Sequence, residues 1–413
     1  MNNTANAVVV LGVLTVGCAA HAESTPYSVG AGISYNSDNN LFRAPRGEEV
    51  SDRFVIASVF AGVDETISRQ RLRANARLRH SWYDERDDLD HNGYSLQLGW
   101  DGATANEITW SLAYAANRGL ASYSNLVAPA LQVRNLETSQ QASATLQIGL
   151  KAQWVANTTL SHREIKYSAP EFATEKLKLD SIGVGVQWNP LGPLSVSLGP
   201  RYTRGRYPQG RALAGGGFEA ETFDRRDIDL GVKWVASGAS TLTGRLSWTK
   251  QEYDQETGRD FSGATGRLGW EWKPTAKIRL NTAISRDTGS ESSFITQSLA
   301  GETLASSGDN SRITNSVALR ADYEVTAKTS LYAGGAYSVR KLSATTLVGG
   351  VPVFVSSGAE RTGNVALGLR YAPTRNSVLG CEVGHERRAT STTLSSPYRV
   401  NTVACSAQLA LQY

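Results

Sequence analysis

Four arginines at alternating positions form the most chemically suggestive cluster in this sequence. They are Arg71, Arg73, Arg77 and Arg79, and apolar side chains such as Leu72 and Leu78 stand between them. Successive side chains of an extended strand point to opposite faces, so these guanidinium groups would share one face. A ladder of guanidinium groups could guide an anionic solute or the carboxylates of a sugar polymer. The alternative is that opposite charges pair with the arginines in a hydrated interior.

The arginines need an element that keeps their charges in water. Residues 70–83 alternate like a strand, and an arginine on the lipid face near the bilayer midplane would cost about 2 to 4 kcal/mol. We therefore expect these side chains to point into the lumen of a β-barrel. The same parity sends other charged residues inward, namely Arg201, Arg245, Arg267, Arg279, Arg320, Arg340, Arg370, Asp101, Asp227, Asp229, Glu271, Asp322, Glu324, Glu382 and Glu386.

Period-two alternation recurs along the whole chain in stretches that fit a tilted membrane span of about ten residues. The other apolar faces lie in residues 27–36, 53–63, 94–100, 108–114, 142–150, 182–188, 194–198, 228–234, 242–248, 268–272, 278–284, 317–323, 331–339, 365–371, 379–383 and 403–413, with a poorer strand at 154–167. Together they predict an all-β fold, a transmembrane antiparallel β-barrel of the outer-membrane type with about 18 strands. The alternative is a large soluble β-sandwich, propeller or solenoid.

Turn lengths alternate, which predicts an orientation. Short turns at 101–106, 189–193, 237–239, 273–275, 326–328 and 372–374 alternate with long polar stretches that include 118–134, 204–224, 287–311 and 342–361. Outer-membrane barrels have short periplasmic turns and long extracellular loops, so we expect both termini in the periplasm. Tryptophans gather beside the short turns, as in an aromatic girdle: Trp100, Trp110, Trp154, Trp188, Trp234, Trp270 and Trp272. The glycine-rich stretch 204–218, with Arg206 and Arg211, is a candidate constriction.

The two ends of the chain carry targeting signals. Residues 1–22 predict a signal peptide, because an apolar run is followed by the small-x-small sequence Ala20-His21-Ala22. Residues 23–413 would form the single barrel domain. The last strand carries Leu409, Leu411 and the terminal Tyr413 on one face, an ending that resembles the signal read by the barrel assembly machinery. We therefore expect an integral protein of the bacterial outer membrane, in contact with its lipid and lipopolysaccharide.

Composition and motifs argue against several other functions. The 42 basic and 38 acidic residues give a net charge of only +4, which does not favour a nucleic-acid partner. The motifs G-x-S-x-G, H-E-x-x-H and C-x-x-C and a phosphate-binding glycine loop are absent. A rim histidine such as His385 beside Glu386 could be imagined as a base. We nevertheless expect no enzyme, no catalytic residues, no cofactor and no metal.

Two cysteines could form a disulfide. Cys381 and Cys405 lie at equal distances from residue 393, near the middle of the last predicted loop, and both have lipid-facing parity. Such residues would be cross-strand neighbours and could be oxidised in the periplasm. Two unpaired, lipid-facing cysteines are the alternative.

The N-terminal third resembles a known family. The sequence Asp38-Asn39-Asn40-Leu41-Phe42-Arg43, the following Arg46-Gly47 and residues 68–73 are similar to EpsL-type proteins over about residues 27–115. These are outer-membrane β-barrels of exopolysaccharide biosynthesis operons, often found with exosortase systems. The resemblance implies a role in the export or assembly of an extracellular polysaccharide, and it supplies no catalytic residues. From the residues alone, Leu41 and Phe42 indicate a loop packed against the rim or the lumen.

The sequence therefore predicts an outer-membrane conduit or export component for exopolysaccharide. Its expected partners are the polysaccharide and a periplasmic polysaccharide export complex. The first alternative is a general or anion-preferring diffusion porin for small solutes. The second is a structural or enzymatic barrel that does not conduct.

Overall fold

The structure is a computed structural model that describes most of the chain. The described residues are 26–104, 107–123, 132–151, 153–190, 192–212, 218–254, 260–288, 297–299, 302–304, 311–348, 351–392 and 395–412. The predicted signal peptide, residues 1–22, and Tyr413 lie outside the described residues.

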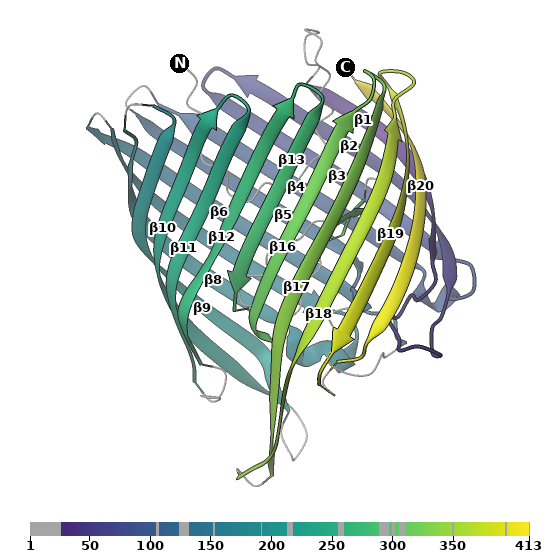
Figure 1. Cartoon of the computed structure of the whole chain (residues 1–413). Coiled ribbons are helices and arrows are strands. Elements are labelled where there is room, and N and C mark those ends of the chain that lie inside the picture. The colour runs from purple at the N-terminus through teal and green to yellow at the C-terminus, as the bar shows by residue number, and fades with distance from the viewer. Residues whose placement is uncertain are drawn as a thin grey trace.

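Eighteen antiparallel strands form a closed barrel (Figure 1). They are β1 (Tyr27–Asp38), β2 (Asp52–Ile67), β3 (Gln70–Tyr83), β4 (His91–Ala103), β5 (Ile108–Leu120), β6 (Leu136–Lys151), β7 (Trp154–Tyr167), β8 (Leu177–Trp188), β9 (Leu194–Ala212), β10 (Phe218–Ser237), β11 (Ser240–Tyr253), β12 (Phe261–Thr275), β13 (Ile278–Asp287), β16 (Ser311–Glu324), β17 (Thr329–Val348), β18 (Val351–Tyr371), β19 (Ser377–Thr390) and β20 (Tyr398–Gln412). The connections contain the 3-10 helices η1 (Asp87–Leu89) and η3 (Pro170–Glu175) and the two-stranded hairpin β14 (Gln297–Leu299) and β15 (Glu302–Leu304). The predicted fold class and strand count are confirmed.

The barrel closes where the first strand meets the last. β1 pairs with β2 on one side and with β20 on the other, and Val29 is the partner of Leu411. Closure leaves no sheet edge, so the backbone of every spanning strand can be hydrogen-bonded inside the lipid. The predicted assembly-signal residues Leu409 and Leu411 lie on the outward face of β20.

No helix among the described residues is long and apolar enough to cross a membrane.

The outer surface carries an apolar band between two aromatic girdles. Large apolar side chains are exposed there on every strand, for example Leu78 at 62% and Leu160 at 50%. The tryptophans predicted beside short turns lie there, and Trp154 stacks with Trp188 at 6.2 Å. A second girdle near the long loops includes Trp82 and Trp248. On β3 the outward face from Leu72 to Trp82 covers about 24 Å of membrane, at about 3.4 Å per residue and a tilt of about 45°.

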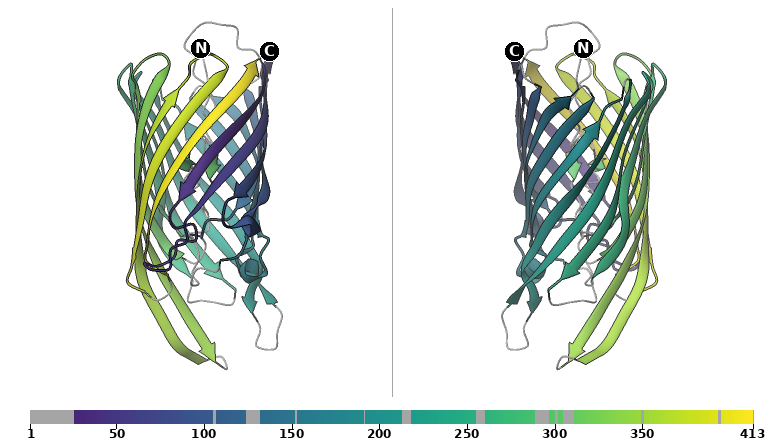
Figure 2. Two further views of the ribbon diagram at one scale, coloured as in Figure 1. Left: turned by 90° about the vertical axis from the view of Figure 1, so that its right-hand side faces the viewer. Right: turned by 90° about the vertical axis from the view of Figure 1, so that its left-hand side faces the viewer.

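Two stretches predicted as long loops are largely strand. β9 continues to Ala212 and β10 begins at Phe218, and the β17–β18 hairpin reaches Val348 and Val351, projecting beyond the barrel in Figure 2. These segments lie beyond the lipid, where a strand needs no apolar face. Because they lack a regular alternation of apolar residues, they were predicted as loops. Arg206 lies on β9 with outward parity, so the prediction of a lumenal constriction at 204–218 is wrong for this residue.

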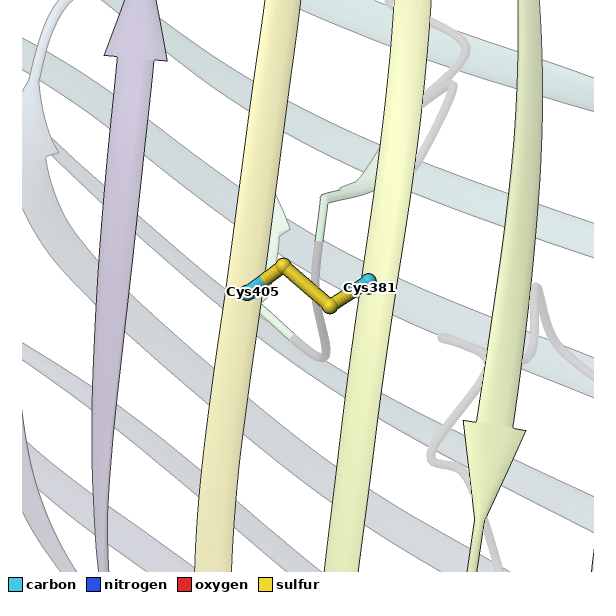
Figure 3. The surroundings of a disulfide bond; sticks show 2 residues. All are labelled: Cys381 and Cys405. Atoms are coloured by element: carbon cyan, nitrogen blue, oxygen red, sulfur yellow. A yellow bond between two sulfur atoms is a disulfide. The ribbon is translucent and has the colours of Figure 1, made fainter.

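A disulfide ties the last two strands together. Cys381 on β19 is the register partner of Cys405 on β20, and the structure joins them by an S–S bond with their Cα atoms 4.1 Å apart (Figure 3). Their parity is that of Leu379 and Val383, which are exposed on the outer surface. The bond therefore lies on the lipid-facing side of the strand that closes the barrel.

Removing this disulfide should destabilise the barrel without altering its outer surface. In the double variant C381V/C405V, valine keeps both positions apolar while the cross-link over 24 residues is lost. We expect the free energy of unfolding to fall by about 3 kcal/mol, the value for a closed loop of this size. Urea unfolding in lipid vesicles measures it, with the reduced wild-type protein as the control. Equal midpoints for oxidised wild type and variant would contradict the expectation.

Candidate functional site

The inner wall of the barrel is the candidate functional site, because it carries the charged faces of the strands. Outward parity is fixed by the exposed apolar residues, for example Leu72 and Leu78 on β3. The alternate positions of β3 therefore face the lumen, as predicted, and they hold Arg71, Arg73, Arg77 and Arg79. Small residues such as Gly183 and Gly185 on β8 have the same inward parity and leave space in the interior.

Two of the four arginines of β3 are paired with acidic side chains near the short turns. Arg71 binds Asp64 of β2 in a bidentate way, with Nε–Oδ1 at 2.7 Å and Nη2–Oδ2 at 2.6 Å. Arg73 forms an ion pair with Asp101 of β4. The Arg71 and Asp64 side chains are each 51% exposed, so this pair lies in open, hydrated space.

The other two arginines of β3 have different partners. The guanidinium of Arg77 lies 4.8 Å from the ring centre of Phe60. Arg79 is buried, and its Nη2 donates a hydrogen bond to the backbone oxygen of Arg118 at 3.0 Å. The four side chains share one face of β3 but contact four different sets of partners. Transport of a solute along an arginine ladder stays a prediction.

The remaining predicted lumen arginines are spread around the wall. Arg201 contacts Asp229 at 2.8 Å and Asp227 at 3.1 Å. Arg320 pairs with Asp322 at 2.8 Å and lies over the ring of Tyr332. Arg245 of β11 stands directly opposite Arg267 of β12, and Arg370 faces inward from β18. The structure therefore distributes positive charge around the lumen rather than gathering it on one strand.

A buried polar network on β10 to β12 was missed by the sequence analysis. Arg225 has inward parity yet is fully buried, and it donates to Asp227 at 2.9 Å and to the Thr288 hydroxyl at 3.1 Å. Thr288 in turn donates to Gln251 at 3.0 Å. The alternation of Arg225 with Asp227 and Asp229 predicts that its side chain points inward. Its burial also involves Thr288, which follows β13 and is distant in the sequence.

This network fixes the start of the connection between β13 and β16 to the inner wall. Thr288 is the first residue after β13, and the hairpin β14–β15 from the same connection lies inside the barrel in Figures 1 and 2. Of the predicted long loop at 287–311, the structure describes residues 287–288, 297–299, 302–304 and 311, and the rest lies outside the described residues.

Connections at the long-loop end of the barrel pack into an apolar mouth cluster, which we define as Leu41, Phe42, Leu89, Tyr123, Ala169 and Phe172. Tyr83 and Tyr167, which pack against it, have inward parity on β3 and β7. The cluster therefore lies against the lumenal side of the wall. Phe42 is its centre, fully buried, with the Tyr123 ring at 4.9 Å and the Arg86 guanidinium at 4.6 Å.

The segment Asp38 to Arg43, which carried the family resemblance, is bound into this mouth. Asn40 is fully buried and exchanges two hydrogen bonds of 2.8 Å with the backbone of Ala44. Arg43 pairs with Asp38 at 2.6 Å, and the side-chain oxygen of Asn39 accepts from the Asn401 backbone at 2.7 Å. Leu41 packs beside Phe42. The segment has a local packing role.

Charges at the mouth follow the same packing. A hydrogen bond from the Arg86 guanidinium lowers the pKa of Asp88, and burial raises the pKa of Tyr123. The lowered pKa keeps Asp88 ionised beside Arg86 at neutral pH, and the raised pKa keeps the Tyr123 hydroxyl protonated. The Tyr123 hydroxyl then donates to the Val133 backbone oxygen at 2.7 Å.

A groove of about 1090 Å³ lies over the middle of β3 to β9. Its large lining side chains, such as Leu98 and Leu112, have outward parity and are exposed. The groove is therefore on the lipid-facing surface, and it is distinct from the lumen.

Comparison with solved structures finds outer-membrane proteins that resemble this chain at low sequence identity. No protein-family model and no curated protein matches it. Outer membrane protein OpdK from Pseudomonas aeruginosa is similar over 93% of this chain and 99% of its own, with 10% identity and a TM-score of 0.46. OccK3 (OpdO) from the same organism covers 93% and 96%, with 15% identity and a TM-score of 0.46. The ferric-catecholate import receptor Fiu from E. coli covers 94% and 82%, with 10% identity and a TM-score of 0.44.

The prediction of an exopolysaccharide export conduit is wrong. No family model supports the EpsL-type resemblance, and the solved barrels that resemble the chain include OpdK and OccK3, which are porin-like outer-membrane proteins. The residues behind the resemblance are engaged in loop packing, as Asn40 and Phe42 show by their complete burial.

Truncating Phe42 should open the mouth cluster without unfolding the barrel. The variant F42A removes a fully buried ring, a loss that costs about 3 to 5 kcal/mol in a packed core. Because cleavage tracks the population of the open form, we expect trypsin to cut after Arg46 and Arg86 at least roughly tenfold faster. F218A is the control, since Phe218 is 46% exposed and outside the cluster. Equal cleavage in F42A and wild type would show that the cluster does not hold the loops.

Proposed function

We propose that this protein is an outer-membrane diffusion channel for small polar solutes. The observation that carries the proposal is the hydrated ion pair Arg71–Asp64, whose side chains are half exposed on the lumenal face of a closed barrel. Charges on an interior face remain exposed only where water enters the interior. A barrel of 18 strands is wide enough to leave an aqueous channel.

The charge pattern of the lumen supports passive diffusion of polar solutes. Arg71, Arg73 and Arg201 each lie beside an aspartate, so the wall offers alternating charges. Such a wall favours water and small polar molecules over a polymer that needs a continuous path.

We propose that the chain lies in the bacterial outer membrane with both termini in the periplasm. β1 begins and β20 ends at the side of the short turns (Figure 1), which is the periplasmic side in barrels of this class. The outward Leu409 and Leu411 near the end of β20 fit insertion by the barrel assembly machinery. The function needs no catalytic residue or cofactor.

Single-channel recording in planar bilayers tests the proposal. The refolded chain should give a steady conductance, and vesicles that contain it should swell in small sugars but not in large dextran. Folded barrels, verified by their heat-dependent mobility in detergent gels, that show neither conductance nor swelling would contradict a channel.

Neutralising two lumenal aspartates should make the channel more permeable to anions. In D64N/D101N the arginines Arg71 and Arg73 lose their acidic partners. One charge about 6 Å from a passing monovalent ion in water contributes about 0.7 kcal/mol, which changes the permeability of each ion by up to roughly threefold. Because the anion gains what the cation loses, the ratio of anion to cation permeability should rise by up to roughly tenfold for each aspartate. Reversal potentials in a salt gradient measure it.

The control for this pair is E48Q, in the exposed connection between β1 and β2. It removes one acidic charge outside the lumen wall and should leave the reversal potential near the wild-type value. An unchanged reversal potential in D64N/D101N would mean that ions do not pass this part of the wall.

A further inference from the structure

One sector of the outer surface carries a row of positive charge, and the acidic residue beside it is Asp84, next to Arg53. We call it the basic arc and define it as Lys341 of β17, Arg361 of β18, Arg387 of β19, Arg399 of β20 and Arg53 of β2. All five have the parity of the exposed apolar residues on their strands and are themselves exposed. Among the described residues, none of the five forms an ion pair.

The basic arc lies just beyond the lipid-facing band, at the end of the barrel that carries the long loops. On each strand the cation lies two or four positions nearer the long loops than an outward valine, namely Val339, Val365, Val383, Val403 and Val55. At about 3.4 Å per residue this is roughly 7 to 14 Å along the strand. That depth is where the charged headgroups of the outer leaflet meet the barrel.

Strand register places the cations side by side. Arg387 is the direct partner of Arg399. The partner of Arg387 on β18 is Gly363, so Arg361, two residues away, is its diagonal neighbour. The partner of Arg361 on β17 is Val339, so Lys341 is in turn diagonal to Arg361. Diagonal neighbours are about 7 to 8 Å apart. From β17 to β18 and from β18 to β19, the two-residue offset runs along the strands in the direction that compensates their tilt. Lys341, Arg361 and Arg387 therefore stay near one height along the barrel axis.

The pair Arg387 and Arg399 is the strongest indication of an anion. Like charges directly opposite each other destabilise a sheet. The neighbouring outward pair, His385 with Asn401, is joined by a 2.8 Å hydrogen bond and contains no carboxylate. An anion bound between the two guanidinium groups would remove the repulsion and accept their hydrogen bonds.

The opposite sector of the same surface pairs some of its outward cations within the protein. On β7 and β8, Lys166 and Lys178 both contact Glu164, at 2.7 and 3.0 Å. On β10 and β11, Arg226 and Lys250 share Glu252. Arg118, Arg206 and Arg286 are outward and exposed without an ion pair among the described residues, so the arc is distinguished by cations on four successive strands, β17 to β20, with no acidic residue among them. The described outward residues in the long-loop half of β17 to β20, β1 and β2 include no aspartate or glutamate.

We propose that the basic arc binds the phosphate groups of lipid A, the phosphorylated glycolipid that anchors lipopolysaccharide in the outer leaflet. Its acyl chains would lie along the apolar band beneath the arc, and one phosphate would lie between Arg387 and Arg399. Lys341, Arg361 and Arg53 would meet the second phosphate or a neighbouring lipid. This lipid site is independent of what passes through the lumen.

Binding of bisphosphorylated lipid A to the purified full chain in detergent, measured by native mass spectrometry, tests the proposal. In R387Q/R399Q, the affinity should fall roughly 30-fold, at about fivefold for each arginine near a charged membrane surface. Lipid A should also raise the thermal midpoint of the wild type more than that of the variant. Without lipid A, the variant should be at least as stable as wild type, because the repulsion is removed.

The matched control is R69Q/K277Q/R375Q, which removes three exposed cations at the short-turn end. It should bind lipid A as wild type does. The proposal is overturned if R387Q/R399Q binds lipid A with wild-type affinity, if the control loses as much affinity, or if phosphatidylglycerol or inorganic phosphate protects the wild type as well as lipid A.

Discussion

Backbone hydrogen bonds between β1 and β20 turn a row of hairpins into a barrel. These strands are joined over a register that runs from Ser28 with Gln412 to Asp38 with Thr402. In lipid an unpaired backbone group costs several kcal/mol, so an open edge of this length could not be inserted. The pairing also assigns a lumenal and a lipid side to each strand, because a register slip of one residue would exchange the two faces.

Once the faces are assigned, charge can occupy only two places. Inside, arginines lie beside aspartates, as Arg201 does beside Asp229, and water in the lumen lowers the cost of each charge. Outside, charge is tolerated only beyond the apolar band, where Arg387 and Arg399 stand opposite each other. Several inner charges are paired within the protein, as Arg201 is with Asp229, whereas Arg387 and Arg399 form no ion pair among the described residues.

Alternation in the sequence was enough to predict the strand count, the outward faces and the pairing of Cys381 with Cys405 in register, because a lipid-facing strand must repeat every second residue. The same criterion failed beyond the membrane. The β17–β18 hairpin extends to Val348 and Val351, but residues 342–356 do not alternate regularly between polar and apolar types, so they leave no periodic signal. The packing of Leu41 and Phe42 against the rim or the lumen was predicted, but their partners were missed for a related reason: Phe42, Tyr123 and Phe172 meet from separate connections, and nothing local predicts that meeting.

The segment that carried the family resemblance has a physical explanation at the seam of the barrel. β1 ends at Asp38, yet the Asn39 backbone still donates to the Asn401 oxygen at 3.2 Å, and Asn40 donates to the Arg399 oxygen at 3.1 Å. The segment thus continues the bonding of β20 after its partner strand has ended, and Phe42 anchors it in the mouth cluster. A motif of this kind can recur wherever a barrel closes, because it satisfies the backbone at the seam. It therefore indicates how the ends of the barrel are joined and carries no information on the solute.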